Sequence, residues 1–152
     1  MQFSCKKKKN EETQDNLIVI TDTTHGFVEY ILIEIEGIKN VQGKIRLGLY
    51  DNETALHAGD VNNAITSSTI EVSNTNVQIK LDSITPGTYA VNLFHDENDN
   101  SELDKNGIGI PKEGFGFSNN ALGTFGPPSF DEAKFTLPEN GYVEMQIALK
   151  FY

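Results

Sequence analysis

An alternation of apolar and polar side chains with a period of two constrains this chain more than any other feature. The stretch VEYILIEIEGI places Ile31, Ile33 and Ile35 on one side and Glu34 and Glu36 on the other. Because successive side chains of a β-strand point to opposite faces of a sheet, one face of this segment would be buried while the other meets water. The pattern, with its many β-branched residues, predicts a strand.

Eight segments share this alternation and are separated by residues typical of turns, including the sequences NTN and PENG. The predicted strands cover residues 16–20, 28–38, 43–51, 68–73, 77–84, 86–96, 133–137 and 141–151. No segment has a convincing helical period, and residues 57–65 would form one helical turn at most. Seven to eight short strands predict an all-β fold. We expect an antiparallel β-sandwich of immunoglobulin-like or transthyretin-like type, with Greek-key connections and one long ordered loop.

Length and charge limit the possible domains and partners. The 152 residues suffice for one domain with its own core, which we place at residues 17–152. The net charge is −10, and residues 6–9 are all lysines, so the remainder of the chain is more acidic still. An acidic body repels phosphate backbones, so we expect no nucleic-acid partner. No stretch approaches the roughly 20 apolar residues of a membrane-spanning helix.

The first 16 residues, MQFSCKKKKNEETQDN, contain the only cysteine, Cys5, and few apolar side chains. We interpret residues 1–16 as a disordered tether. Ser4 before Cys5 and the charged segment after it are typical of the end of a bacterial lipoprotein signal peptide. However, Gln2 stands where an aliphatic residue is usual, and the apolar export segment is absent. We expect Cys5 to carry a lipid, and the alternative is an ordinary thiol in a tail.

A long stretch between the predicted strands at 86–96 and 133–137 has neither strand nor helix periodicity. Loops beyond about 12–15 residues are uncommon in compact domains and are often functional. This one is too apolar for a solvated linker. Its large apolar residues are Ile108, Ile110, Phe115, Phe117, Leu122, Phe125 and Phe130. We expect an ordered loop that packs on the sandwich and needs an anchor at its base, because ordering a chain costs conformational entropy.

The run DENDNSELD at the start of this loop has an oxygen-bearing side chain at every second position. Calcium loops present their ligands with the spacing D-x-N-x-N-x-x-x-D, in which the seventh residue contributes its backbone carbonyl. Calcium takes hard oxygen ligands, so we predict that this run binds a calcium ion. The predicted ligands are the side chains of Asp96, Asn98, Asn100 and Asp104 and the carbonyl of Glu102.

The run departs from an EF-hand at two positions and has no flanking helices. Ser101 replaces the glycine of the sixth position, and Gly107 stands where a bidentate glutamate is expected. A further carboxylate would have to come from elsewhere, and Glu113 is the nearest unassigned acid in the loop. The alternative interpretation is a solvated acidic turn, because Asp and Asn are common in turns.

The segment FHDENDNSELDKNGIGIPKEGFGFSNN, followed by GPPSFDEAKF, closely resembles the signature of the bacterial domain-of-unknown-function family DUF2141. The similarity runs from about Tyr30 to Ala148. The usual family pattern D-x-N-x-N-G-x-L-D is kept here except that Ser101 replaces the glycine. The resemblance implies a secreted or lipid-anchored β-sandwich protein of Gram-negative bacteria, and it carries no assigned activity.

Histidine and aromatic residues near the loop provide weaker signals. His95 adjoins Asp96, but no second His or Cys lies at zinc-ligand spacing, so we interpret His95 as a packed residue at a strand end. We expect the rings of the GFGFSNN segment to pack the long loop on the sandwich, and the alternative is that this segment binds a ligand. The candidate ligand-binding residues are Phe115, Phe117, Ser118, Asn119 and Asn120.

Catalytic motifs have little support, because the chain has no G-x-S-x-G sequence and no glycine-rich phosphate loop after a strand. We therefore expect a non-enzymatic binding or structural lipoprotein in the envelope of a Gram-negative bacterium. It would contact the membrane only through the lipid anchor and would have a glycan or protein partner. The second hypothesis is a small extracytoplasmic hydrolase acting on glycans or peptides, with a carboxylate pair drawn from the 22 acids.

Overall fold

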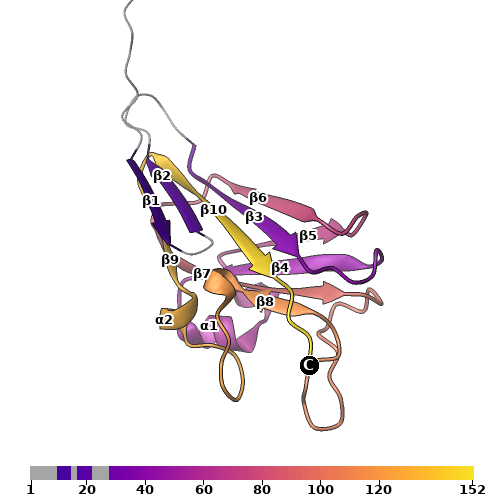
Figure 1. Ribbon diagram of the computed structural model, residues 1–152. Helices are drawn as coiled ribbons and strands as arrows, with labels where there is room; N and C mark the ends of the chain where they lie inside the picture. Colours follow the sequence, from indigo (N-terminus) through magenta and orange to yellow (C-terminus); the bar gives the residue numbers. More distant parts are fainter. Residues whose placement is uncertain (1–9, 15–16, 22–27) are drawn as a thin grey trace, which may run out of the picture.

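Two β-sheets form the framework of the computed structural model, which describes residues 10–14, 17–21 and 28–152 (Figure 1). The first sheet has the strand order β1 (Asn10–Gln14), β2 (Leu17–Thr21), β10 (Gly141–Ala148), β3 (Tyr30–Glu36) and β6 (Val77–Asp82). The second has the order β5 (Thr66–Glu71), β4 (Lys44–Tyr50), β7 (Gly87–Asp96) and β8 (Phe115–Phe117), and β9 (Phe135–Leu137) also pairs with β7. The chain is therefore mostly β, as expected.

All eight predicted strands are present, as β2 to β7, β9 and β10, and two further strands were not predicted. β1 lies inside the predicted tether and pairs with β2 as a hairpin. Its sequence, NEETQ, has no apolar residue that would show alternation. β8 consists of the three residues FGF, which are too few to show a period. Residues 1–9, with Cys5, lie outside the described residues.

The strands are not all antiparallel, and the expectation of a purely antiparallel arrangement is wrong for one pair. β10 lies between β2 and β3, antiparallel to β2 and parallel to β3, with Val143 opposite Ile31. A parallel pair needs a long crossover connection rather than a hairpin. The whole chain between β3 and β10 forms that connection, and no local sequence pattern specifies its direction.

The NTN and PENG turns connect the two sheets rather than neighbours in one sheet. Residues 74–76 lead from β5 in the second sheet to β6 in the first, and the N–H of Asn76 donates to Oδ1 of Asn74 at 2.8 Å. The PENG turn leads from β9 to β10, and its Asn140 has a φ of +52°. Asparagine tolerates this left-handed conformation better than most residues do.

Short helices cover the second sheet, and of these only one turn within residues 57–65 was allowed for, where η1 (Val61–Asn63) lies. The two α-helices were missed because their caps hold them rather than a long periodic pattern. α1 (Glu53–Ala58) begins at Asn52, whose Oδ1 accepts the N–H of Ala55 at 2.9 Å, and ends at Gly59 in the left-handed conformation. α2 (Phe130–Ala133) begins with a capping box between Ser129 and Glu132. Two short 3-10 helices complete the set, η1 (Val61–Asn63) and η2 (Ser118–Asn120).

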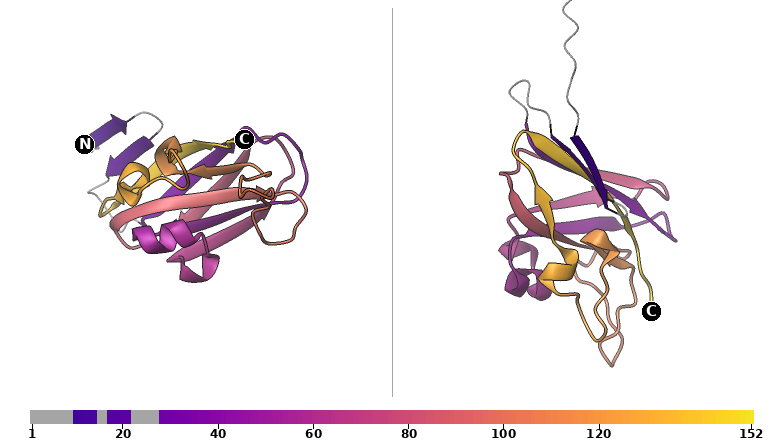
Figure 2. Two further views of the ribbon diagram at one scale, coloured as in Figure 1. Left: turned by 90° about the horizontal axis from the view of Figure 1, so that it is seen from below. Right: turned by 60° about the vertical axis from the view of Figure 1, so that its left-hand side comes forward.

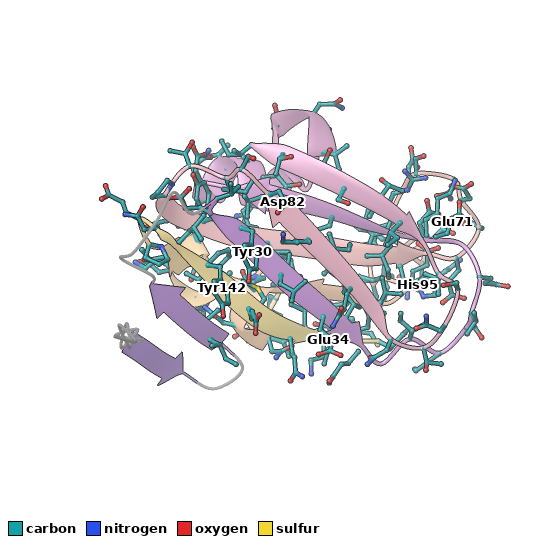
Figure 3. All side chains as sticks on the ribbon, turned by 90° about the horizontal axis from the view of Figure 1, so that it is seen from above. Tyr30, Glu34, Glu71, Asp82, His95 and Tyr142 are labelled. Atoms are coloured by element: carbon teal, nitrogen blue, oxygen red, sulfur yellow. The ribbon has the colours of Figure 1, made fainter. Side chains whose placement is uncertain are left out.

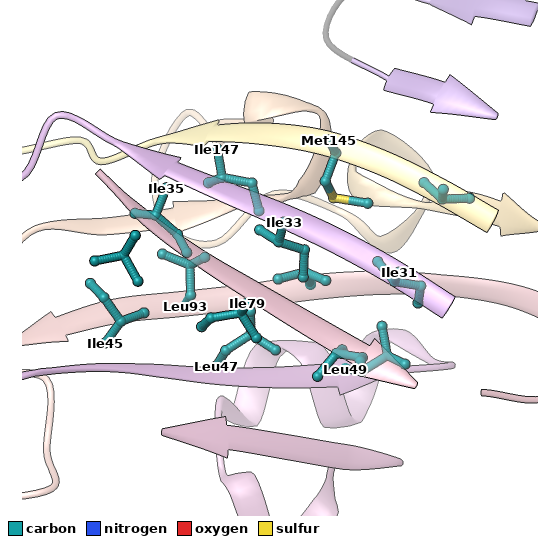
Figure 4. Packing of buried hydrophobic residues seen from close by; sticks show 14 of the residues in the cluster. Ile31, Ile33, Ile35, Ile45, Leu47, Leu49, Ile79, Leu93, Met145 and Ile147 are labelled. Carbon is teal, nitrogen blue, oxygen red and sulfur yellow. The ribbon is translucent and has the colours of Figure 1, made fainter. Parts of the chain in front are cut away.

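The main core lies between the two sheets and contains the side chains that the alternation placed inward (Figure 4). Ile31, Ile33 and Ile35 of β3 are fully buried, as are Leu47 and Leu49 of β4. Burying one such aliphatic side chain contributes about 1.5–3 kcal/mol, so this interior accounts for most of the stabilisation of the two sheets.

The second sheet is covered on its other face as well, by the helices and by the chain between β7 and β9. A second apolar cluster fills this layer. Its buried members are Tyr50, Ala55, Leu56, Ala90, Phe115, Phe117 and Ala133. Phe115 and Phe117 join this layer because Gly116 between them lies against the main core, where an added Cβ would meet Ile147 Cγ2 at 2.6 Å. Burial of Phe115 and Phe117 thus helps to order the long loop. The expectation that the loop packs its apolar residues on the sandwich is wrong for four of them, which are exposed: Ile108, Ile110, Leu122 and Phe125.

The chain between β7 and β9 projects from one end of the two sheets (Figures 1 and 2). On the outer face of the first sheet, the parallel register places Tyr30 opposite Tyr142 (Figure 3). Their rings stack with centroids 4.6 Å apart, and the Lys80 ammonium lies 4.4 Å from the centre of the Tyr30 ring.

We predict that Leu47→Ala lowers the free energy of unfolding by about 2–5 kcal/mol, because it leaves a cavity between the two sheets. Urea denaturation monitored by circular dichroism measures the change. Val41→Ala is the control, since Val41 is 52% exposed, and its effect should remain within about 0.5 kcal/mol. Equal effects of the two substitutions would contradict a core centred on Leu47.

Candidate functional site

The predicted calcium run, residues 96–104, is called the acidic loop below and begins on the last residue of β7. Alternation along β7 directs Tyr89, Val91, Leu93 and His95 into the main core. Asp96 points the opposite way, toward the layer that covers the second sheet, and it is nevertheless fully buried. A buried carboxylate must have charged or hydrogen-bonding partners to remain ionised.

Asp96 has partners on both oxygens. Arg46 of β4 donates from Nε to Oδ2 at 2.5 Å, and the backbone N–H of Ser101 donates to the same oxygen at 2.9 Å. The N–H of Asn100 donates to Oδ1 at 3.0 Å. Burial by itself raises the pKa of Asp96, but the Arg46 guanidinium and the two N–H groups outweigh it, so the pKa lies below its usual value.

A second aspartate in the loop, Asp99, is held by two cations of the same strand. Arg46 donates from Nη2 to Oδ1 at 2.8 Å, and Lys44 donates from Nζ to Oδ2 at 2.6 Å. The Asp99 hydrogen bond is the largest cause of a raised Lys44 pKa. Sequence reasoning missed both cations as site residues. Their signal was their spacing, since Lys44 and Arg46 occupy alternate positions on the outward side of the predicted strand.

The alternate residues of the acidic loop converge on Asp104. Asn98 and Asn100 donate their side-chain amides to the two Asp104 oxygens, at 2.8 Å and 3.1 Å. The amide oxygens of the same two residues accept backbone N–H groups two positions further on, from Asn100 at 3.2 Å and from Glu102 at 2.9 Å. These repeated turns curl the backbone so that every second side chain points inward.

Glu113 closes the base of the acidic loop. Its buried carboxylate accepts the N–H of Glu97 at 2.9 Å on one oxygen and the N–H of Asp104 at 3.0 Å on the other. The N–H of Lys112 also donates to the carbonyl of Asp104 at 2.8 Å. Glu113 therefore joins the two ends of the loop, and its predicted role as a metal ligand stays a prediction.

The turn before β4 supports the loop from behind. His95 is fully buried, and its Nε2 lies 2.7 Å from the carbonyl oxygen of Gln42, which confirms its interpretation as a packed residue. Gly43 has a φ of +66°, and an added Cβ would lie 2.1 Å from the carbonyl oxygen of Asp96. Asn40 donates its amide to Glu97 at 2.7 Å. The close approach of Gly43 to the backbone of Asp96 fixes the position at which the chain leaves β7.

The donor set fits a hard cation in part. Asp96 and Asp104 supply carboxylate oxygens, and Asn98 and Asn100 supply amide oxygens, which are the ligands that calcium prefers. Among the described residues, no three His, Cys, Asp or Glu side chains gather as a metal cluster. Any such site here would rely on amide and backbone oxygens. Of the predicted ligands, Glu102 has an exposed side chain, and the expectation that its carbonyl binds the ion stays a prediction.

The GFGFSNN segment has its polar groups engaged within the protein. Ser118 is buried, accepts the N–H of Val91 at 2.8 Å and donates to the carbonyl of Ala133 at 2.6 Å. Asn119 donates to the carbonyls of Glu132 and Lys134, and Asn120 accepts the N–H of Ala148 at 2.8 Å. These contacts fasten the long loop to β7, α2 and β10. Ligand binding by these residues stays a prediction.

In the part of the chain that the structure describes, no helix is long and apolar enough to cross a membrane. Comparison with known families places the acidic loop, Glu113 and the GFGFSNN segment in one matched region. The model of a family described as "Uncharacterized protein conserved in bacteria (DUF2141)" matches residues 33–146, which is more than half of the chain. No curated protein and no solved structure matches.

We predict that Asp96→Asn lowers the free energy of unfolding near neutral pH by roughly 2–4 kcal/mol, because Arg46 loses its buried partner. The Asp96 pKa is depressed in the folded state. Its stabilisation is therefore complete above the ordinary value of 3.8 and is lost as the pH falls through the folded value. Urea denaturation between about pH 6 and about pH 2 should show that the free energy of unfolding falls less with pH in Asp96→Asn than in the parent.

Asp82→Asn is the matched control, since Asp82 pairs with Lys80 at 2.7 Å on the exposed face of β6. Exposed pairs contribute about 0–1 kcal/mol, so this variant should follow the parent closely at every pH. An acid dependence unchanged in Asp96→Asn would show that Asp96 is not the titrating anchor.

Proposed function

The chain belongs to the DUF2141 family of uncharacterised bacterial proteins, and on this premise we propose that it is a non-enzymatic envelope module with a structural calcium ion in the acidic loop. The ion would hold the base of the long loop, and the outer part of that loop would be the contact surface for a partner. Asp96, Asn98, Asn100 and Asp104 would bind the ion with their side chains.

The main support for this proposal is the surroundings of Asp104, where amides are the partners of the carboxylate oxygens and no cationic side chain of the described residues pairs with them. Its carboxylate is half-buried, and both of its oxygens accept amide groups of alternate loop residues. Arg46 and Lys44 pair with Asp96 and Asp99, and within the described ranges no Lys, Arg or His lies within ion-pair distance of Asp104. An acid in this position favours a cation, because neutral amides compensate only part of its charge.

The amides themselves are suited to a metal. The side-chain oxygens of Asn98 and Asn100 each accept one backbone N–H and keep a further lone pair, with which they could bind a metal ion. Calcium tolerates irregular sets of six to eight oxygens, whereas magnesium demands a near-octahedral site. The curled backbone of the acidic loop thus supports calcium over magnesium.

We also propose that the two sheets form an antiparallel-type sandwich of immunoglobulin-like or transthyretin-like class, with the β3–β10 pair as its parallel exception. The shared core and the turns that change sheet support this class. The proposed location is the outside of the cytoplasm, with Cys5 as a lipid anchor. The sequence around Cys5 and the family resemblance support this location.

The alternative of a small hydrolase stays a prediction. A pocket beside β7 and β8 has one acidic side chain, that of Glu102, among its lining residues. A glycoside hydrolase of the usual kind needs two carboxylates on either side of the scissile bond. No observation therefore favours this function over the module.

We predict that calcium raises the thermal unfolding midpoint of the full chain after treatment with a chelator, by roughly 5–10 °C at one hundred times Kd. Magnesium at the same concentration should have little effect. Differential scanning calorimetry measures both midpoints. Asp104→Ala should abolish the response, because Asp104 supplies the charge that no other group in its surroundings balances.

Asp131→Ala is the control for this experiment, since Asp131 is exposed and forms an ion pair with Lys134 on the surface. This variant should keep the full calcium response. If calcium leaves the midpoint of the parent unchanged, or if Asp104→Ala responds like the parent, the acidic loop is a solvated turn and the calcium proposal is wrong.

The lipid anchor has a separate test. We predict that protein isolated from its native bacterium partitions into the detergent phase of a phase-separating detergent, and that mass spectrometry finds an acylated glyceryl group on Cys5. Cys5→Ser should partition into the aqueous phase. An unmodified Cys5 in membrane-derived protein would contradict this part of the proposal.

A further inference from the structure

We propose that a pocket of about 780 Å³ on the outer face of the second sheet binds an uncharged, mainly apolar small molecule that carries one hydrogen-bonding group. Pockets for small molecules span roughly 300–1,000 Å³, so this one is large enough for a ligand of two or three rings. It borders the acidic loop at Ser101, Glu102 and Leu103, but none of the side chains predicted to bind calcium lines it.

The floor of the pocket is formed by neighbouring strands. Asn92 and Phe94 of β7 lie beside their register partners Phe117 and Phe115 of β8, and all four side chains line the pocket. The two β8 rings meet edge to face with centroids 6.3 Å apart. Tyr152 stacks on Phe115 at 5.5 Å and extends the aromatic wall. Aromatic surfaces of this kind favour flat, apolar ligands.

Two tips of the long loop form the rim, and each exposes a large apolar side chain. Ile108 is 82% exposed and Phe125 is fully exposed, and both line the pocket. A ligand seated on the floor would cover part of both side chains. Removing such apolar surface from water is favourable by about 25 cal/mol per Å².

The first tip is a built structure that holds Ile108 in place. Lys105 and Pro111 form a β-bridge across its base. Inside it, Asn106 accepts the N–H groups of Ile108 and Ile110 on its Oδ1, at 3.1 Å and 3.0 Å. A rim that is ordered before binding loses little conformational entropy when a ligand arrives.

One polar group on the floor is available to the ligand. The side-chain amide of Asn92 has no hydrogen bond to any described residue, and it lies beside Gly59 at the end of α1. An amide that is half-buried in apolar surroundings benefits from a partner, and it offers a donor and an acceptor at one point. This predicts one matching polar group on the ligand, such as an N–H or a hydroxyl.

The charges of the lining favour a neutral ligand. Of the Asp, Glu, Lys and Arg side chains, the lining contains Glu102 and Lys105, which have opposite signs. The chain as a whole carries a net charge of −10, which disfavours anions. An uncharged molecule avoids both the repulsion and the desolvation of an unpaired charge.

Three matched probes test the ligand class on the full chain. N-phenyl-1-naphthylamine has two aromatic parts joined by an N–H, 1-benzylnaphthalene replaces that N–H by a methylene, and 8-anilino-1-naphthalenesulfonate adds a sulfonate. We expect saturable one-to-one binding of the amine by fluorescence titration, and binding at least tenfold weaker for the sulfonate. The hydrocarbon is measured by its displacement of the amine.

Two rim variants and one floor variant locate the binding. Ile108→Ser and Phe125→Ser should each weaken binding of the amine by about tenfold, because the ligand then covers less apolar surface. Asn92→Leu should weaken binding of the amine by roughly fivefold and change the affinity for the hydrocarbon by less than about twofold. Only the amine can form a hydrogen bond with the Asn92 side chain. Val41→Ser is the control, because Val41 is exposed and does not line the pocket, and it should bind like the parent.

The proposal is overturned if the amine does not bind saturably, if both rim variants bind it like the parent, or if the sulfonate binds as tightly as the amine. It is also overturned if sedimentation shows a parent dimer that Phe125→Ser converts to a monomer, because a second copy of the chain would then fill the pocket. Thermal unfolding of each variant confirms that it is folded. Since both rim residues are exposed, their substitution should leave the midpoint unchanged.

Discussion

The contact between Asp96 and Arg46 determines how the rest of the long loop is arranged. A carboxylate at a fully buried position is stable as an anion only with close partners, and here Arg46 of the neighbouring strand and two backbone N–H groups of the loop supply them. These N–H groups belong to residues four and five positions later, so the chain must curl back as soon as β7 ends. Gly43 permits this curl because no Cβ intrudes on the backbone of Asp96. Glu113 then ties the far end of the curl to its start.

This anchored base has consequences at the outer end of the loop. The residues after Asp104 are held at their base by the Lys105–Pro111 bridge, and the following residues re-enter the second sheet as β8. Phe115 and Phe117 are therefore buried between the sheet and its cover, and the pocket is left between this aromatic floor and the two tips. The acidic loop and the pocket thus have different roles: one fixes the geometry of the loop, and the other presents an apolar surface at its end.

Much of the fold followed from local patterns. Ile31, Ile33 and Ile35 alternate with half-exposed residues, and period-two burial of this kind favours a strand with one face in the core, so eight of the strands were predicted from this pattern. β8 was missed because its three residues are too few to show a strand period. The α-helices were missed because six and four residues do not show a helical period. The parallel pairing of β3 with β10 was missed because strand direction depends on where the chain returns, and that is a property of the whole domain.

The sequence alone determined that the acidic run curls with an oxygen-bearing side chain at every second position, because Asp and Asn form turns through local hydrogen bonds. It also indicated that Glu113 lies near the run, although as a calcium ligand. Only the tertiary structure decided which basic side chains form ion pairs with the acids of the loop. Arg46 and Lys44 lie some fifty residues earlier in the chain, and they reach Asp96 and Asp99 because β4 pairs with β7 in one particular register. Tertiary structure likewise decided that the polar groups of Ser118, Asn119 and Asn120 fasten the loop, while Asn92 lines a pocket. Hydrogen-bond partners across strands are set by packing, and a linear sequence does not encode them in any local period.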